Sequence, residues 1–313
     1  MSVKRNKLLY YAVNFFRWIV PAKFYEWQLD KKLAVLSSYD EDDVMSRVNY
    51  YNKLNKGLSV GDRSIEVKDV KKIETPKSYY FDTFEYTRYF NRNLRLNLLV
   101  GDITHVAEYP SIQKSRPINN DNSNGVLLKL DKHRHFLFVE DKRPFTSKLD
   151  KLVGRAVIRQ PHRIRFMEMY FDHPMCNLGQ VNKEGGNISW LKPKMSIFDH
   201  LEYKFILSLE GYDVATNLKW IMSSNSIAVM PLPKYETWFM EGCLVPNHHF
   251  ILIKDDYSDL EDRLLFYIHH PEEANNIIKN ANLYVKQFLD KQKEDLISIL
   301  VLKKYFDCTS QLD

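Results

Sequence analysis

Three arginines, Arg155, Arg159 and Arg163, follow one another closely in the segment GRAVIRQPHR. A guanidinium group donates parallel hydrogen bonds in a geometry that matches the paired oxygens of a phosphate. The segment therefore favours binding of a diphosphate such as that of a nucleotide. The alternative is a basic surface loop that binds no ligand, and the residues alone leave both interpretations open.

Three later segments carry residues that suit an anion or a sugar. In EGYDVAT, Gly211 permits a close backbone approach, and Asp213 can cap a following helix whose first amides would face an anion. Glu236 opens a predicted short helix in YETWF, where it can accept ribose hydroxyls or simply favour the helix start. His248 or His249 in VPNHHF could contact phosphate, although a histidine at a strand start is more often structural. None of these segments has a GxGxxG or P-loop pattern.

One loop in the first half, GDITHVAEYPSIQKSRP, is the candidate for acid–base chemistry. It follows a predicted strand, LRLNLLV, and holds Asp102 and Glu108 before ending in the basic residues Lys114 and Arg116. A carboxylate there could act as a general base on a ligand bound by the second half. The alternative is an acidic loop balanced by its basic neighbours. The sequence has no G-x-S-x-G or H-E-x-x-H motif, so a hydrolase is not favoured.

Neither metal binding nor disulfide bonding is expected. The acidic run DEDD, residues 40–43, opens a predicted helix, where it complements the helix dipole. No histidine or further carboxylate is placed nearby to complete an octahedral metal site. The cysteines Cys176, Cys243 and Cys308 are far apart and odd in number, which indicates a reducing compartment.

The elements that position these residues alternate regularly in the second half. Strands are predicted in KFILSL, SIAVM and HHFILI, and helices in VATNLKWIM, YETWFMEG and SDLEDRLLFYI, the last behind a capping box of Ser258 and Glu261. Pro271 is predicted to start a further helix with a periodic apolar face. Continuous apolar strands alternating with helices predict a parallel sheet covered on both faces. Ligands of such sheets lie outside the carboxyl ends of the strands.

The length and charge of the chain limit its architecture and partners. Its 313 residues suffice for two domains of about 150 residues each, and its composition is that of a soluble globular protein. A shift in composition near residues 148–151 divides it into residues 1–150 and 151–290, followed by residues 291–313. The net charge of +5 suits acidic partners but falls short of a nucleic-acid-binding signature.

The N-terminal segment MSVKRNKLLYYAVNFFRWIVPAKFYEW is basic and aromatic. Asn14 and Arg17 interrupt its apolar run and no small-residue cleavage site follows, so a signal peptide is not favoured. The segment is also too short and too polar to span a bilayer. It is either an interfacial helix on an anionic membrane or an ordinary helix docked on its own domain.

In their order along the chain, these segments resemble glycosyltransferase family 90. The resemblance covers residues 95–290 and rests on YKFILSLEG, VATNLKW, SNSIAVM, YETWFMEGCLVPNHHF and KDDYSDLEDRL, with GRAVIRQPHR and EYPSIQKSRP upstream. The pieces KSRP, RHF and GYDVATNLKW are most similar to the bacterial lipopolysaccharide branch of the family.

The resemblance implies an α/β GT-B architecture, in which two Rossmann-like domains face each other across a cleft. Residues 1–150 would form the acceptor-side domain and residues 151–290 the donor domain, and the helix in 291–313 would pack back on the first domain. The implied reaction is an inverting, metal-independent transfer of a hexose from UDP-glucose or UDP-galactose to a lipopolysaccharide core.

The resemblance also implies roles for single residues. Glu108 matches the position of the catalytic base, with Asp102 as the second choice, and Lys114 and Arg116 would bind the acceptor. The donor would be held by residues of the second half, with the diphosphate on the arginines and the ribose on the glutamate, namely Arg155, Arg163, Gly211, Asp213, Glu236 and His249.

Two other functions remain as alternatives: a non-catalytic protein that binds anionic lipid or nucleic acid, and a protein O-glycosyltransferase. The absence of a signal peptide and of a disulfide framework weighs against the second. The sequence therefore predicts a cytoplasmic enzyme peripheral to the inner membrane. Its expected partners are a UDP-sugar, a lipopolysaccharide core and an anionic membrane surface, with no nucleic acid and no metal cofactor.

Overall fold

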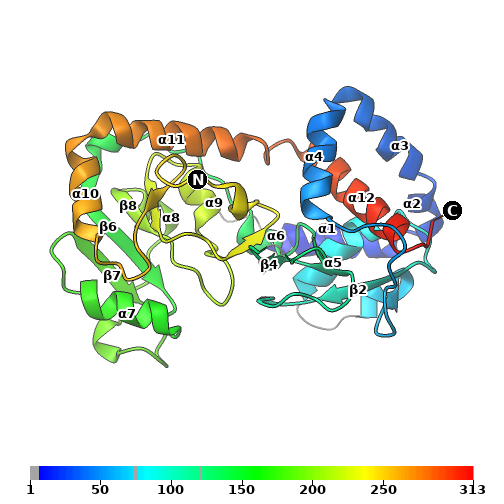
Figure 1. Cartoon of the computed structure of the whole chain (residues 1–313), viewed down its shortest axis with the longest axis horizontal. Coiled ribbons are helices and arrows are strands. Elements are labelled where there is room, and N and C mark those ends of the chain that lie inside the picture. Colours follow the sequence, from blue (N-terminus) through cyan, green and yellow to red (C-terminus); the bar gives the residue numbers. More distant parts are fainter. Residues whose placement is uncertain (1–6, 73–76, 120, 313) are drawn as a thin grey trace. The chain divides into compact units, whose positions relative to one another are not determined.

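We describe the protein from a computed structural model, which defines residues 7–72, 77–119 and 121–312 (Figure 1). These residues form two compact units, each assembled from separate segments of the chain. Among the described residues, unit 1 contains Phe136–Pro233 and Cys243–Gln287, and unit 2 contains those of 7–135, Lys234–Gly242 and 288–312. The first division between the units lies between residues 135 and 136.

Unit 1 is built around a five-stranded sheet with the strand order β11-β9-β8-β6-β7. Its strands are β6 (Leu149–Ala156), β7 (Cys176–Gln180), β8 (Tyr203–Leu207), β9 (Ile227–Met230) and β11 (Ile251–Leu252). All four pairings are parallel, so the carboxyl ends of the five strands lie at one edge of the sheet. The parallel sheet predicted for the second half is thus confirmed.

The helices of unit 1 supply apolar faces that pack with this sheet. They are α7 (Pro161–Tyr170), α8 (Ile197–His200), α9 (Leu218–Met222), α10 (Leu260–His269) and α11 (Pro271–Lys286), with the 3-10 helices η3 (Phe145–Ser147) and η4 (Ile188–Trp190). Phe205 and Val229 of the strands join Phe166, Leu264 and Ala274 of the helices in one buried core. Burial of such side chains is the main stabilising contribution to folding.

The start of helix α11 matches its predicted signal. Pro271 lies in its first turn, where no backbone N–H is needed. The predicted apolar face is buried throughout, through Ala274, Ile277, Ile278, Ala281 and Val285.

Two local predictions in this half are wrong. Helix α10 begins at Leu260 with Asp259 as its N-cap residue, and no side chain caps it, so Ser258 and Glu261 form no capping box. The segment around Glu236 is not a helix but the short strand β10 (Tyr235–Thr237), which pairs antiparallel with β4 (Ser115–Pro117). Aromatic and β-branched residues such as Tyr235 and Thr237 favour strands when a pairing partner is available.

Unit 2 contains a second sheet, with the strand order β1-β2-β3-β5. Its strands are β1 (Ile65–Glu66), β2 (Arg95–Leu99), β3 (Ser111–Gln113) and β5 (Gly125–Leu127). Strands β2, β3 and β5 are parallel, and β1 pairs antiparallel with β2. Again the carboxyl ends of the parallel strands share one edge.

Helices from widely separated parts of the sequence complete unit 2. They are α1 (Lys7–Ile19), α2 (Ala22–Glu26), α3 (Leu29–Leu33), α4 (Glu41–Tyr51), α5 (Lys77–Thr87), α6 (Lys132–His135) and α12 (Lys291–Cys308), with the 3-10 helices η1 (Ala34–Ser38) and η2 (Val67–Lys72). The side chain of Asp40 accepts a hydrogen bond from the Asp43 amide, so the acidic run does open α4. The C-terminal helix α12 packs against α4 and α5. None of the helices in the described ranges has the length and hydrophobicity needed to cross a lipid bilayer.

Candidate functional site

The clearest candidate for an anion site lies at the carboxyl edge of the unit 1 sheet, where Arg163 joins two loops. Arg163 lies in the first turn of α7, after the loop that follows β6. It donates hydrogen bonds to the carbonyls of Val157 (2.9 Å), Leu209 (2.8 Å) and Glu210 (2.8 Å), the last two in the loop after β8. A Cβ atom on Gly211 would lie 3.6 Å from Arg163 Nη2. The structure therefore brings two of the predicted donor residues together.

The charge of Arg163 is not neutralised by these bonds, because all three acceptors are uncharged carbonyls. Burial lowers the pKa of its guanidinium, with Tyr257 acting in the opposite direction. A cation that is partly removed from water and bonded to neutral groups attracts an anion strongly. This corner, formed by the first turn of α7 and the loop after β8, suits a phosphate group.

Asp213 lies in the same loop but does not play the structural part predicted for it. Helix α9 begins only at Leu218, its N-cap residue is Asn217, and no side chain caps it. The loop is held by Asn217, which donates to the Leu207 carbonyl at 2.9 Å and accepts from Ser208 Oγ at 3.2 Å. Asp213 is buried, with 2% of its surface exposed, and its role in donor binding stays a prediction.

Arg155 is held by a different part of unit 1. It lies within β6, opposite Gly179 of β7, and it donates to the carbonyls of Asn177 (2.8 Å) and Pro193 (3.2 Å) and to the Asn177 side chain (2.9 Å). Side chains alternate along a strand, so Arg155 points to the face opposite that of its neighbour Ala156. Burial lowers the pKa of Arg155 as well. Arg155 and Arg163 thus contact separate segments, and a shared diphosphate stays a prediction.

His249 lies at the other edge of the same sheet, because it precedes β11, which runs parallel to the remaining strands. Its Nδ1 accepts a hydrogen bond from the Val245 amide at 2.9 Å, and its ring lies 5.0 Å from that of Tyr284 in α11. The structure does not bring His249 to the carboxyl edge with Arg163.

The environment of His249 predicts a loss of stability in acid. Burial, together with the neighbouring His248, lowers the pKa of His249 from 6.5 to about 4. The unfolded chain therefore binds a proton between these values that the folded protein does not, so the free energy of unfolding should fall as the pH drops from 6.5 towards 4. Urea denaturation over this range measures the effect. His249→Asn keeps an acceptor for the Val245 amide and cannot titrate, so it should flatten the slope; an unchanged slope would contradict the assignment.

In unit 2, Asp102 lies at the carboxyl edge of the sheet, in the loop that follows β2. Lys114, which follows β3, contacts it with a distance of 2.6 Å between Nζ and Oδ1. The Lys114 side chain is 2% exposed, whereas that of Asp102 is 38% exposed. A buried lysine thus orients a carboxylate that remains accessible to a ligand.

Glu108 lies at the opposite edge of this sheet. It precedes β3, and its backbone carbonyl accepts a hydrogen bond of 2.9 Å from Asn124, which directly precedes β5. The side chain of Glu108 is exposed. The structure therefore separates the two predicted carboxylates, and only Asp102 lies at the edge where parallel sheets bind ligands.

Arg116 and Glu236 form a buried ion pair inside unit 2. Their side chains are 0% and 3% exposed, and Arg116 Nε lies 2.7 Å from Glu236 Oε1. Arg116 also donates to the carbonyls of Tyr50 (2.7 Å) and Gly125 (2.8 Å), and the Tyr50 hydroxyl donates to Glu236. The pair is set by the register of β4 with β10. Acceptor binding by Arg116 and ribose binding by Glu236 stay predictions.

Sequence reasoning did not find a second buried cluster, centred on Glu294 of α12. Its carboxylate accepts from Lys129 Nζ and from the Trp238 indole, both at 2.7 Å, and pairs with Arg47 of α4 at 2.7 Å. These residues come from four distant segments, so no spacing in the sequence could have indicated the cluster. It stabilises the packing of α12 within unit 2. Within the described ranges, no group of three or more His, Cys, Asp or Glu side chains could hold a metal ion.

Comparison with known proteins finds a relative that matches most of the chain. The family described as Glycosyl transferase family 90 matches residues 174–306. O-glucosyltransferase LpsA of Dichelobacter nodosus is 43% identical over 263 residues, which cover 84% of this chain and 82% of that protein. Protein O-glucosyltransferase 3 of Homo sapiens is 29% identical over 112 residues, or 36% of this chain and 22% of that protein. The resemblance found in the sequence is confirmed: the chain belongs to glycosyl transferase family 90 and is a glycosyltransferase.

Proposed function

We propose that the protein is an inverting glucosyltransferase that moves glucose from UDP-glucose to a hydroxyl group of a lipopolysaccharide core. The observation that carries the donor assignment is the charge of Arg163 at the carboxyl edge of the parallel sheet in unit 1. The similarity to a bacterial protein named O-glucosyltransferase LpsA supports glucose as the transferred sugar. In this proposal the units take the GT-B arrangement, with unit 1 as the donor unit and unit 2 as the acceptor unit.

Donor binding is assigned to the corner between β6 and β8. Arg163 contacts the diphosphate of the donor, and the turn at Gly211 lies against the donor because the absence of a side chain allows a close approach. Arginine supplies the positive charge that the departing diphosphate requires, without a metal ion.

Proton transfer is assigned to Asp102. Its carboxylate takes the proton of the acceptor hydroxyl while the hydroxyl oxygen attacks the anomeric carbon of glucose from the side opposite UDP. The bond between that carbon and the diphosphate oxygen breaks, UDP leaves with the bonding electrons, and the configuration at the anomeric carbon inverts. Lys114 keeps the Asp102 carboxylate in place, and the position of Glu108 at the other edge disfavours it as the base.

We further propose that the enzyme acts at the cytoplasmic side of the inner membrane, as a peripheral protein. A lipopolysaccharide core is linked to lipid while it is extended, so its transferase must work at a membrane surface. The net charge of +5 suits the phosphate groups of such an acceptor and of anionic lipids.

The donor assignment predicts that UDP and UDP-glucose raise the melting temperature of the protein. Arg163→Ala should weaken UDP binding by about one to two orders of magnitude, because a hydrogen bond to a charged group contributes about 1.5–3 kcal/mol. Calorimetric titration with UDP measures the change. Arg159→Ala is the matched control, since Arg159 is an exposed arginine in the same loop and should alter affinity little. Equal UDP affinity for wild type and Arg163→Ala would remove Arg163 from the donor site.

A further inference from the structure

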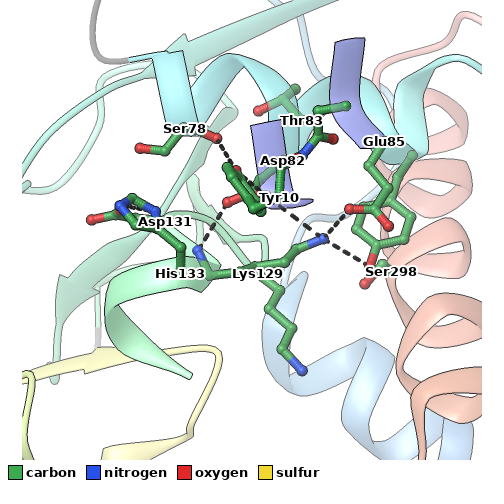
Figure 2. A network of polar contacts seen from close by, with 12 residues as sticks. Tyr10, Ser78, Asp82, Thr83, Glu85, Lys129, Asp131, His133 and Ser298 are labelled. Atoms are coloured by element: carbon green, nitrogen blue, oxygen red, sulfur yellow. Dashed lines mark hydrogen bonds and ion pairs between the residues drawn. The ribbon is translucent and has the colours of Figure 1, made fainter. Parts of the chain in front are cut away.

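The polar side chains of helix α1 face the rest of unit 2, where hydrogen bonds and an ion pair hold them. Tyr10, Asn14 and Arg17 are spaced by four and three residues, so they share one face of the helix. The Tyr10 hydroxyl donates to Asp82 Oδ1 at 2.8 Å, as Figure 2 shows, and Arg17 pairs with Glu85 at 2.7 Å. Asn14 is buried, with 2% of its surface exposed. The contact face of α1 is therefore its polar face.

The partners of this face are themselves buried, which fixes the rotation of α1 about its axis. Asp82 of α5 is 0% exposed and also accepts a hydrogen bond from the Lys132 amide at 2.9 Å. Lys132 Nζ in turn lies 2.7 Å from Glu85. Burial raises the pKa of Asp82 to about 6. Turning α1 over would leave Asp82 and Glu85 without their α1 partners, and each buried polar group that loses its partner destabilises the fold.

The opposite face of α1 is apolar and exposed. Leu8 is 81% exposed, Phe16 72%, and Trp27 just after α2 88%. The exposed apolar set also includes Leu9, Val13, Phe15, Trp18, Ile19 and Phe24. A helix on the surface of a soluble protein normally shows the reverse arrangement, with its apolar stripe against the core. A continuous exposed patch of this kind marks an interaction surface.

Positive charge adjoins this patch and indicates what covers it. Lys23 of α2 is exposed, and residues 1–25 of the sequence include five lysines or arginines and no aspartate or glutamate. An excess of positive charge beside Trp, Phe and Leu side chains is typical of helices that lie in the interface of an anionic bilayer.

We infer that α1 and α2 form an in-plane membrane anchor whose partner is an anionic lipid surface. The apolar side chains of α1 enter the boundary between headgroups and acyl chains, and the cations beside them lie against lipid phosphates. The inference extends the proposed function by naming the surface that brings the enzyme to a lipid-linked acceptor. It rests on that function only for the identity of the acceptor, because lipid binding follows from α1 and its surroundings alone.

Co-sedimentation with phospholipid vesicles tests the anchor. The full chain should bind vesicles of phosphatidylcholine and phosphatidylglycerol, and bind pure phosphatidylcholine more weakly. Leu9→Glu combined with Phe16→Glu should weaken binding by at least about tenfold, because both side chains are exposed and would enter the bilayer. Ile188→Glu is the matched control, since Ile188 is 66% exposed in unit 1 and should not alter lipid binding.

Tryptophan fluorescence reports whether the exposed apolar face of α1 contacts the lipid. Lipids brominated on their acyl chains should quench Trp18 and Trp27, and Trp18→Phe with Trp27→Phe should abolish quenching because the remaining tryptophans are buried.

The double glutamate variant should transfer glucose to a water-soluble core oligosaccharide at the wild-type rate, so failure of the anchor and failure of the proposed activity are distinguishable. Unchanged vesicle binding by the folded double variant would overturn the inference. A wild-type dimer that this variant dissociates would identify a second copy as the partner instead.

Discussion

Asp102→Asn is expected to lower kcat by about two to four orders of magnitude and to leave UDP affinity unchanged. The substitution keeps the shape of the side chain and an oxygen that can accept from Lys114, but it removes the group that takes the acceptor proton. Initial rates with UDP-glucose and a core acceptor measure kcat, and calorimetry measures UDP binding. The melting temperature of the variant should be checked, because Lys114 loses the charge of its partner.

Glu108→Gln is the control that distinguishes the two carboxylates. Its turnover should be close to that of wild type, since Glu108 lies at the amino edge of the unit 2 sheet and Asp102 at the carboxyl edge. An inactive Glu108→Gln enzyme beside a fully active Asp102→Asn enzyme would return the role of the base to Glu108.

Glu236→Ala is expected to lower the free energy of unfolding by about 3–5 kcal/mol. The substitution leaves the guanidinium of Arg116, which is 0% exposed, without its carboxylate. Urea denaturation of the purified variant measures the loss. Glu140→Ala provides the comparison, because Glu140 pairs with Lys142 where both side chains are more than four-fifths exposed, and exposed pairs contribute little.

A double-mutant cycle with Arg116→Met separates the ion pair from other effects of these substitutions. Removing both charges should cost less than the sum of the single changes, since neither partner is then left alone in the interior. A Glu236→Ala protein as stable as wild type but with strongly reduced UDP affinity would instead support the predicted contact with ribose.

The elements that follow from local pattern were predictable from the sequence. The parallel sheet of unit 1 was indicated by continuous apolar strands such as that of β9, and helix α11 by Pro271 and its apolar period. Each of these signals is contained within its own short stretch of sequence. Strand β10 was not predictable, because its partner Arg116 is 120 residues away from Glu236 and three-residue strands carry almost no periodic signal.

The candidate site likewise combines features that local sequence predicts with features that depend on distant segments. The arginine-rich segment and the Gly211 turn were found from residue types, and the structure places Arg163 beside that turn. The choice between Asp102 and Glu108 depends on which edge of the sheet each occupies, which in turn depends on the short strand β3. Residues 101–117 have the sequence pattern of a single loop, so the pattern does not reveal on which edge each carboxylate lies. The orientation of α1 likewise depends on its distant partner Asp82.

Transfer from UDP-glucose to a truncated lipopolysaccharide core tests the proposed function most directly. Mass spectrometry of the acceptor and NMR of the new linkage should show that the acceptor gains glucose, that UDP is released in equal amount, and that the anomeric configuration is inverted relative to the donor. A folded protein that binds UDP but transfers no glucose to the core, or that retains the configuration of the donor, would contradict it.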